Sequence, residues 1–598
     1  MDVGVCCQVS SPKANKDDYA EHPKGVLMIL RDPEAPALTS AIAYFSMEVG
    51  LDPAMPTYSG GLGVLAGDTL RAAADLAVPM VGVTLLHRKP FRQHLDARGV
   101  QTDTSYGWDQ KEFLEPLEPH VVVNIEGREV EIQAWRYLVR GVSGHMVPVY
   151  FLDTAVPENS PWDQTLTDNL YGGDDHYRLC QEVVLGLGGI AMLRALGHEK
   201  VQLYHMNEGH SALLTMALLE EQTDGRGLRA ATKKDKEAVR QRCVFTTHTP
   251  VPAGHDQFSL DMVRRVVGDE RTSALEAVEC CLNNTLNMTY LALVFSRYIN
   301  GVSQRHHDIS HSMFPAYPIN SITNGVHAVT WTAPAFQELY DRHIPEWRVD
   351  NLYLRYAISI PLQEIQQAHA AAKRELLAEV KSRTGVRLDP TAMTLGFARR
   401  ATAYKRAEML LSDPDRLKRI ASQVGPLQII YGGKSHPQDS SGKAIIQRVF
   451  ELAAPLKDIV PIVYLEEYDM TLGKYVCSGV DVWLNNPQKP HEASGTSGMK
   501  AALNGVPSLS VLDGWWIEGH LEGVTGWSIG DDWDAESNVA RETLSLYDKL
   551  EYVILPMFYG RPTAFARVMR SAIAINASFF NAQRMMLQYL ENSYRLFG

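Results

Sequence analysis

Short apolar runs alternate with helical stretches along this chain of 598 residues, and the alternation occurs in two series. In the first series, residues 42–49 and 78–86 read as strands, and residues 64–77 read as a helix between them. A glycine-rich turn, residues 59–63, precedes this helix. The pattern recurs at 201–222 and continues with an apolar run at 243–248. Strands separated by helices predict parallel sheets that are covered by helices on both faces.

The second series follows residues 321–326. Its apolar runs begin at residues 393, 427, 459, 480 and 506, and a helical pattern covers residues 406–423. Two such series predict an α/β fold with two doubly wound, Rossmann-like domains facing a central cleft, where ligands bind at the carboxyl ends of the strands. The chain is too long for one core. We expect an N-terminal cleft domain at 1–325, a second domain at 326–570, and a C-terminal helix at 571–598 that packs back across both.

Charge and composition argue against some classes of binding partner. The formal net charge is −13, and no long basic run is present, which argues against nucleic-acid binding. The sequence contains no run of eighteen apolar residues, so no membrane span is predicted. The first residues also lack the apolar stretch of a signal peptide. Seven cysteines without a C-x-x-C pair fit a reducing compartment. Cys6 and Cys7 lack a lipidation motif around them. We therefore expect a cytoplasmic protein without nucleic-acid or membrane partners.

The segment 491–507 contains a lysine in apolar surroundings. A loop rich in serine, glycine and threonine leads into a helix that carries Lys500. Burial lowers the pKa of a lysine and makes its amine a good nucleophile toward an aldehyde, while the loop offers backbone N–H groups to a phosphate. These are the requirements for binding pyridoxal phosphate. An amphipathic helix whose lysine reaches water explains the same pattern, and the residues alone leave both interpretations open.

Cations gather at the predicted strand ends of the second series. Arg399, Arg400, Lys405 and Arg406 lie between a strand and a helix, and Lys434 follows the next strand. Such a cluster can bind a dianion in a cleft. A solvated basic edge is the alternative interpretation.

Histidines stand at two strand ends of the first series. His210 and His248 each lie beside polar residues. Each histidine can be interpreted either as a contact of a substrate or as a structural residue. His307 and His311 have the i, i+4 spacing of some zinc helices. They lack the H-E-x-x-H glutamate and an evident third ligand, so no metal is expected.

The motif EASGTSGMK at 492–500 resembles the cofactor-lysine motif of the glycogen, starch and maltodextrin phosphorylases, in the form of the short bacterial and archaeal branch. Other segments similar to that family occur in its order: AYFSMEVGL, YSGGLGVLAGD, FRQ, LYGGDDHYRLCQE, NEGH, FTTHTPVPAGHD, TNGVH, ARRATAYKR, GGKSHP, LEEYDMTLGKYVCSGVDVWLNNP and LDGWWIEGH. They cover residues 42 to 520.

This resemblance implies a fold of the retaining glycosyltransferase B type and a transferase that uses pyridoxal 5'-phosphate. The implied reaction is reversible phosphorolysis of an α-1,4-glucan or maltodextrin by inorganic phosphate, which releases α-glucose 1-phosphate from the non-reducing end with retention. Members of the family are commonly homodimers. The phosphorylation segment and nucleotide site of the regulated animal enzymes have no counterpart here, so we expect no allosteric regulation.

The resemblance also assigns roles to residues. The catalytic group comprises Lys500, Arg400 and Lys405. The residues assigned to the cofactor are Lys500, Thr496, Ser497, Gly498, Tyr468 and Gly61. Those assigned to the substrates are Gly60, Leu62, Arg399, Asn324, Glu492, Ser494, Gly495, His248, Asn207 and His210.

The chain departs from the family pattern at three points. The family carries a histidine just before NGV, whereas this chain has Arg297 and Tyr298, which puts one sugar contact in doubt; we expect these residues to alter sugar handling without abolishing it. Lys89-Pro90 replaces Gly-Tyr before FRQ. The extra N-terminal domain of many short-branch members is not expected.

Two other functions remain to be distinguished. A glycosyltransferase of the same fold that uses a nucleotide sugar would need no lysine at position 500. A catalytically inactive glucan-binding protein would not need the phosphate cations.

Overall fold

The computed structural model describes residues 41–251, 254–531 and 536–595, which belong to one compact unit. The expectations for Cys6, Cys7 and the start of the chain lie outside the described residues.

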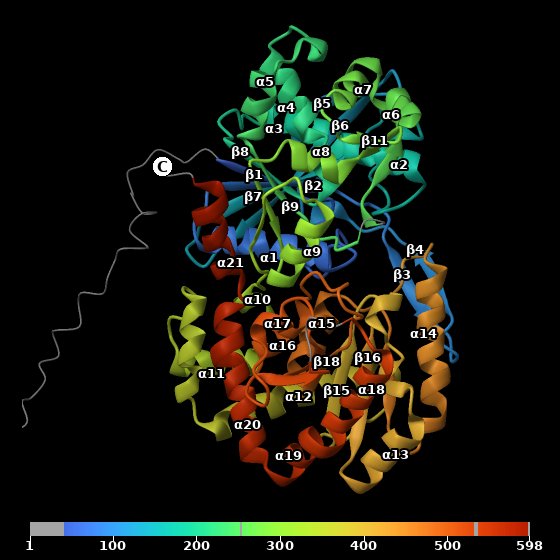
Figure 1. Cartoon of the computed structure of the whole chain (residues 1–598), viewed down its shortest axis with the longest axis vertical. Coiled ribbons are helices and arrows are strands. Elements are labelled where there is room, and N and C mark those ends of the chain that lie inside the picture. Colours follow the sequence, from blue (N-terminus) through green and yellow to red (C-terminus); the bar gives the residue numbers. More distant parts are fainter. Residues whose placement is uncertain (1–40, 252–253, 532–535, 596–598) are drawn as a thin grey trace, which may run out of the picture. The chain divides into compact units, whose positions relative to one another are not determined.

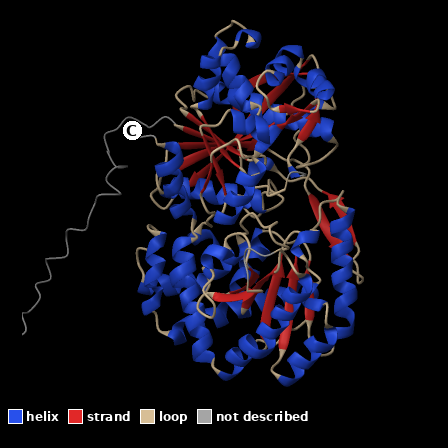
Figure 2. Cartoon of the chain, in the orientation of Figure 1, coloured by secondary structure: helices blue, strands red, loops and turns tan. Residues whose placement is uncertain are grey.

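Within these residues, nine strands form the first sheet, in the order β14-β13-β9-β8-β1-β2-β7-β6-β5 (Figures 1 and 2). The strands are β1 (Ile42–Phe45), β2 (Met80–Leu85), β5 (Glu115–Ile125), β6 (Arg128–Arg140), β7 (Met146–Asp153), β8 (Leu203–Asn207), β9 (Cys243–Thr246), β13 (Tyr298–Gly301) and β14 (Ile319–Ser321). Pairing is parallel from β14 to β7 and antiparallel from β7 through β6 to β5. The predicted parallel sheet is confirmed, whereas the antiparallel edge was not predicted.

Helices cover both faces of this sheet. Ala43 and Phe45 join one apolar cluster, while Ile42 and Tyr44 join another on the opposite face, because successive side chains of a strand point to opposite sides. The helices of this half are α1 (Gly61–Asp75), α2 (Asp175–Val183), α3 (Gly189–Ala195), α4 (Leu214–Thr223), α5 (Lys233–Arg240), α6 (Leu260–Val267), α7 (Asp269–Glu276), α8 (Met288–Val294) and α9 (Gln304–Met313). Three short strands, β10 (Gln257–Ser259), β11 (Cys281–Leu282) and β12 (Thr285–Asn287), form a separate antiparallel sheet.

The second sheet is entirely parallel, with the order β17-β16-β15-β18-β19-β20. Its strands are β15 (Met393–Ala398), β16 (Leu427–Gly432), β17 (Ile462–Leu465), β18 (Val482–Asn485), β19 (Ser508–Val511) and β20 (Gly526–Ile529). Its helices are α10 (Ala328–Trp331), α11 (Pro334–His343), α12 (Leu362–Thr384), α13 (Pro414–Gln423), α14 (Ser440–Ala453), α15 (Met470–Gly479), α16 (Ser497–Ala502), α17 (Trp516–Gly519), α18 (Val539–Asp548), α19 (Leu555–Gly560) and α20 (Pro562–Ser571).

The helix expected at 406–423 is shorter than predicted, since α13 begins only at Pro414. Asp413 caps this helix, and a residue before proline is disfavoured in the helical conformation. Arg406 adopts a left-handed conformation with φ +49°, which also prevents a continuous helix.

The C-terminal segment is helical, as expected, and its last α-helix, α21 (Ala582–Gln588), returns to the first sheet. Met585 and Met586 pack in one apolar cluster with Leu65 and Leu70 of α1. Val326 and Asn581 form a β-bridge. The segment that leads from the first sheet to the second and the segment that leads back to it therefore lie side by side.

The hairpin β3 (Phe91–Leu95) and β4 (Gln101–Ser105) belongs to the first half of the sequence but contacts the second. The Gln93 side chain donates to the carbonyl of Gly433 (3.1 Å), and Gln101 donates to that of Ser435 (2.8 Å). Figure 1 shows the hairpin beside α14. The hairpin thus precedes the expected boundary at residue 325 in sequence but contacts residues that follow it.

Candidate active site

Strand order places the carboxyl ends of both sheets around one cavity. The order reverses between β1 and β8 in the first sheet, and between β15 and β18 in the second. A crevice forms outside the strand ends at such a reversal. Residues shortly after these four strands, namely Glu48, Glu208, Arg399 and His491, line a cavity of about 620 Å³.

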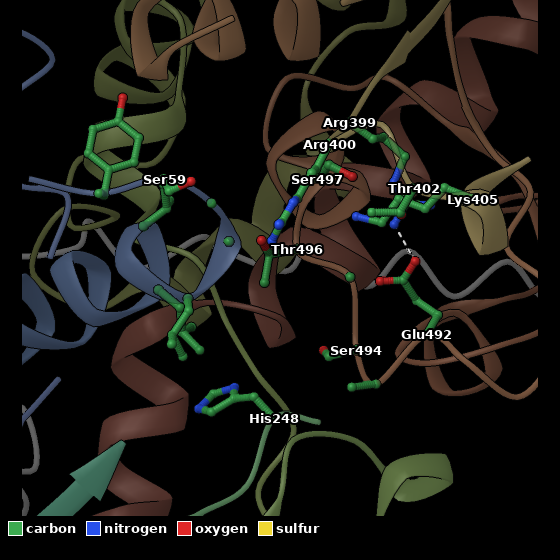
Figure 3. Close-up of a pocket in the computed structure, with 18 of the residues that line it drawn as sticks. Ser59, His248, Arg399, Arg400, Thr402, Lys405, Glu492, Ser494, Thr496 and Ser497 are labelled. Atoms are coloured by element: carbon green, nitrogen blue, oxygen red, sulfur yellow. Dashed lines mark hydrogen bonds and ion pairs between the residues drawn. The ribbon is translucent and has the colours of Figure 1, made fainter. Parts of the chain in front are cut away.

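Most of the predicted site residues line this cavity. They are Gly60, Gly61, Leu62, His210, His248, Asn324, Arg399, Arg400, Lys405, Tyr468, Glu492, Ser494, Gly495, Thr496, Ser497 and Lys500. Figure 3 shows His248 and Ser59 on the side opposite Arg399, Lys405 and Glu492. Two predicted residues lie behind the wall. Asn207 holds His248, and Gly498 packs where a Cβ would approach Trp515 to 2.8 Å.

Lys500 is buried at the wall of the cavity, with 9% of its surface exposed. Its Nζ lies 3.8 Å from the centroid of the Trp331 ring, and the Trp331 indole donates to Asp68 (2.8 Å). Burial lowers the pKa of Lys500, although Asp68 and Cys477 oppose the shift. The amine therefore faces the cavity rather than bulk water. This geometry favours the interpretation of Lys500 as a nucleophile over that of a lysine that reaches solvent.

Three cations lie together just after β15: Arg399, Arg400 and Lys405. Arg399 pairs with Glu492, yet its Nη1 is buried without a hydrogen-bond partner among the described residues. Burial, with the charges of Arg399 and Arg400, lowers the pKa of Lys405 to about 7, and Glu492 opposes this. One carboxylate does not neutralise three cations, so the cluster suits an anion. Lys434 also lines the cavity.

Arg406 does not belong to this cluster. Its guanidinium pairs with Glu542 (2.5 Å) and donates to the carbonyls of Asn486 and Pro487. Its left-handed backbone turns the side chain toward these partners. Of the four candidate cations in this segment, Arg406 is therefore the one that the structure separates from the cluster.

The loop that carries Glu492 also presents an unsatisfied hydroxyl. Ser494 Oγ is buried without a partner among the described residues. The Asp513 carboxylate accepts the backbone N–H of Glu492 (2.9 Å), and the backbone N–H of Trp515 donates to the carbonyl of Ser494 (2.9 Å). Burial raises the pKa of Asp513 to about 7; the backbone N–H of Glu492 opposes this shift, and the Glu492 carboxylate charge adds to it. Sequence reasoning missed Asp513, which fixes the loop from behind.

The glycine loop is held by a carboxylate. Glu48 accepts the N–H groups of Ser59 (2.6 Å) and Gly60 (3.1 Å), and the hydroxyl of Tyr171 (3.0 Å). Helix α1 begins at Gly61, and a Cβ on Gly60 or Gly61 would project into open space. The positive end of the α1 dipole is therefore accessible from the cavity.

His248 is a neutral hydrogen-bonding group. Burial lowers its pKa to about 3. Its Nε2 lies 2.6 Å from Asn207 Oδ1, and the Asn207 amide nitrogen donates to Ser46 Oγ (3.1 Å). These bonds assign the proton of His248 to Nε2, which leaves Nδ1 as an acceptor. His210 pairs with Asp256 at 3.3 Å.

Several lining residues were not predicted: Glu48, Tyr58, Ser59, Tyr171, Glu208, Trp331, Tyr404 and Asp469. Glu48 and Glu208 follow β1 and β8 closely, so the rule that ligands bind at strand ends pointed to their positions. Tyr171 and Trp331 come from segments that no strand end marks.

Arg297 and Tyr298 do not line the cavity. Arg297 donates to the carbonyls of Ser593 (2.9 Å) and Tyr594 (2.8 Å), and Tyr298 packs against the apolar cluster beneath the C-terminal segment. The expectation that these residues handle the sugar is not supported, because both side chains are directed toward the end of the chain.

Changing these two positions should affect stability rather than sugar binding. We expect Tyr298→Phe to leave the KM for glucan unchanged within about twofold, and Arg297→Ala to lower the free energy of unfolding by about 1–3 kcal/mol through two lost charge-assisted bonds. Steady-state kinetics and thermal unfolding measure these effects. A large rise in KM for Tyr298→Phe would place its hydroxyl in the sugar site.

No helix in the described part of the chain is long and apolar enough to cross a membrane. Among the same residues, no three His, Cys, Asp or Glu side chains are grouped to hold a metal ion. The rings of His307 and His311 stack with centroids 6.2 Å apart.

A buried lysine amine and a cluster of cations in one cleft suit an enzyme that binds an anion beside a reactive amine. Residues 253–524 match the family model for carbohydrate phosphorylase. The chain is 37% identical to the maltodextrin phosphorylase of Thermococcus litoralis and to the glycogen phosphorylase of Mycobacterium tuberculosis, over 94% of this chain and 71% of each relative. It is 34% identical to the glycogen phosphorylase of Aquifex aeolicus, over 92% of this chain and 86% of the relative.

The chain therefore belongs to the carbohydrate phosphorylase family, and it is a glycosyltransferase. Members of this family use pyridoxal phosphate.

Proposed function

We propose that this protein is an α-1,4-glucan phosphorylase that releases the non-reducing-end glucose as α-glucose 1-phosphate with retention, reversibly. The observation that carries the proposal is one cavity that holds a buried lysine amine, three cations around one carboxylate, and unsatisfied polar groups. The substrates are an α-glucan or maltodextrin and inorganic phosphate.

The residues of the cavity fit pyridoxal 5'-phosphate. Lys500 offers a lysine whose lowered pKa suits an aldehyde, and Trp331 supplies a flat apolar wall beside it. Gly498 allows the loop to pack closely against Trp515. We propose that Lys500 holds the aldehyde and that Thr496, Ser497, Gly498, Tyr468 and Gly61 surround the rest of the cofactor. When bound, the group supplies a phosphate with a second pKa near 6, an acid close to neutral pH.

The protein residues then bind and orient the substrates. Arg400 and Lys405 attract the substrate phosphate, and Arg399 keeps a free N–H beside it. The sugar is held by hydrogen bonds to Asn324, Glu492 and Ser494. Glu492 and Ser494 belong to the loop beside the phosphate cations. Oriented in this way, substrate phosphate can protonate the leaving glycosidic oxygen and then attack the cation-like sugar carbon from the same face.

Other residues complete the proposed sugar site. We place Gly60, Leu62, Gly495, His248 and His210 in contact with the glucan, and we assign Asn207 to positioning His248 through its 2.6 Å bond. Nδ1 of His248 can accept a hydrogen bond from a sugar hydroxyl at any physiological pH, because this imidazole stays neutral.

The finer architecture is also part of the proposal. Both strand orders fit two Rossmann-like domains that face the cleft, as in glycosyltransferases of the B type. We divide the chain at residues 325 and 570, with the β3–β4 hairpin and α21 crossing these boundaries. We further propose a cytoplasmic enzyme that forms a homodimer and lacks allosteric control.

An assay with several donors distinguishes this function from its rivals. Purified enzyme reconstituted with pyridoxal phosphate should release glucose 1-phosphate from maltodextrin, starch or glycogen only when phosphate is present. Transfer from a nucleotide sugar without phosphate dependence would favour the nucleotide-sugar glycosyltransferase. Binding of glucan without turnover would favour an inactive binding protein.

Phosphate binding should depend on pH through Lys405. Its charged form is favoured below a pKa of about 7, so the KM for phosphate should rise above that pH, by up to about tenfold per unit. Lys405→Arg keeps its charge and should lose this alkaline rise. Kinetics of wild type and Lys405→Arg from pH 6 to 9 test this. Ionisation of the phosphate substrate is the same in both assays, so the difference between the two KM profiles reports on Lys405. Asp513 also titrates near this pH, and a rise of unchanged size in Lys405→Arg would exclude Lys405 as its source.

A further inference from the structure

The loop of Thr323 and Asn324 lies where the chain first crosses from one sheet to the other. Asn324 lines the cavity, and its Oδ1 is buried without a hydrogen-bond partner among the described residues. The backbone N–H of Asn324 donates to the carbonyl of Val302 (3.1 Å). This bond engages the backbone N–H of Asn324 only, so the carbonyl groups of Thr323 and Asn324 must be held by other segments.

Arg584 of α21 holds these carbonyls. Its Nη1 donates to the carbonyl of Thr323 (2.5 Å), and its Nη2 donates to that of Asn324 (2.9 Å). The residue is distant in sequence, yet its planar guanidinium presents two N–H groups to two successive carbonyls. Such a bidentate bond fixes direction as well as distance.

The guanidinium is itself fixed. Its Nε donates to the carbonyl of Phe579 (2.8 Å), Nη1 donates to Gln588 Oε1 (2.9 Å), and the Phe579 ring lies 4.7 Å from its central carbon. Burial lowers the pKa of Arg584 to about 10, so it stays charged near neutral pH. Arg584 therefore joins α21 to the Thr323–Asn324 loop as one rigid unit.

The surrounding backbone leaves this loop little freedom. A Cβ on Gly325 would meet the carbonyl oxygen of Asn581 at 2.1 Å, and Ala582 donates its N–H to the carbonyl of Val326 (2.9 Å). Glu518 accepts the Thr323 hydroxyl (2.8 Å) from the second half. The position of Asn324 is thus set by the C-terminal helix and by both halves of the fold.

We propose that Arg584 is a positioning residue for the sugar site, and that the C-terminal helix completes this site by fixing the direction of the Asn324 side chain. The inference rests on the proposed function, because it takes Asn324 as a contact of the sugar. Lysine cannot replace Arg584, since one ammonium cannot donate along two fixed directions to the loop and also reach the Phe579 carbonyl.

The test compares Arg584→Lys, Gln588→Met and the control Arg567→Lys, whose position on α20 is exposed. Each is prepared as full-length holoenzyme. We expect Arg584→Lys to raise the KM for maltoheptaose by about tenfold, with the KM for phosphate unchanged within twofold. Gln588→Met, which removes only one support of Arg584, should shift the KM for maltoheptaose in the same direction by about two- to threefold, and the control should match wild type.

A purely structural role predicts a different result. Equal losses for both substrates, or a lower kcat with both KM values unchanged, would overturn the proposal, as would an unchanged KM for maltoheptaose in Arg584→Lys. If Arg584→Lys does not fold, Gln588→Met decides by the same criteria. Calorimetric titration with maltoheptaose measures sugar binding without turnover. Failure of phosphorolysis in wild type would therefore refute the proposed function, while the titration would still show whether Arg584 supports the sugar site.

Discussion

Replacing Lys500 with alanine should abolish cofactor attachment and lower phosphorolysis by at least about a thousandfold, equivalent to ~4 kcal/mol of barrier. Lys500 is buried beside Trp331, and its lowered pKa favours the neutral amine that an aldehyde requires. The variant should also lack the near-ultraviolet absorbance of a covalently held pyridoxal group. Absorbance and initial rates measure these two effects on the same preparation.

The matched control is Lys457→Ala, at an exposed position away from the cavity. It should keep wild-type absorbance and activity. Sodium borohydride reduction of wild type, followed by peptide mapping, should place the pyridoxyl group on Lys500. A pyridoxyl group on another lysine, or full activity in Lys500→Ala, would contradict the assignment.

Arg400→Ala and Lys405→Ala should each lower kcat/KM for phosphate by roughly 10²–10³, the usual cost of removing one preorganised charge at a developing anion. Both side chains line the cavity beside Arg399, whose own charge is partly engaged by Glu492. Sugar affinity should change much less, because the neighbouring sugar contacts remain. Initial rates at varied phosphate and fixed maltodextrin provide the measurement.

Arg419→Ala, on the exposed surface of α13, is the control for removing an arginine. It should leave kcat/KM for phosphate unchanged. If Arg400→Ala or Lys405→Ala keeps near-wild-type phosphorolysis, the substrate phosphate binds elsewhere.

The location of the site followed from the sequence, because the carboxyl ends of parallel strands meet at one edge of a sheet. Arg399 follows β15 and His248 follows β9, and the structure brings both to the same cavity. The pattern around Lys500 left two interpretations open, and the resemblance of EASGTSGMK to the family's cofactor-lysine motif decided between them. The class of fold and the principal chemical groups of the site were therefore accessible without coordinates.

Contacts between distant segments could not be predicted in this way. Gln93 meets Gly433, and Arg584 meets Asn324, through bonds that no local periodicity encodes. Asp513 gave no signal either, since an aspartate after a strand is common and only its bond to Glu492 shows its role. The helix at 406–423 was overestimated because the apolar pattern outweighed the signal from Pro414.

The direction of the side chains at Arg297 and Tyr298 was also beyond the sequence. Both precede a segment that resembles the family's sugar site, but the returning C-terminal segment supplies the partners of Arg297. A residue's neighbours in sequence place its backbone, whereas the packing of a distant segment decides what its side chain contacts.

The most direct test of the account is to follow the reaction of reconstituted enzyme with maltoheptaose and inorganic phosphate by ¹H and ³¹P NMR. The account predicts that α-glucose 1-phosphate is the first phosphorylated product, that maltohexaose appears at the same rate, and that both disappear from the reaction of Lys500→Ala. Formation of β-glucose 1-phosphate, or release of free glucose without consumption of phosphate, would contradict it.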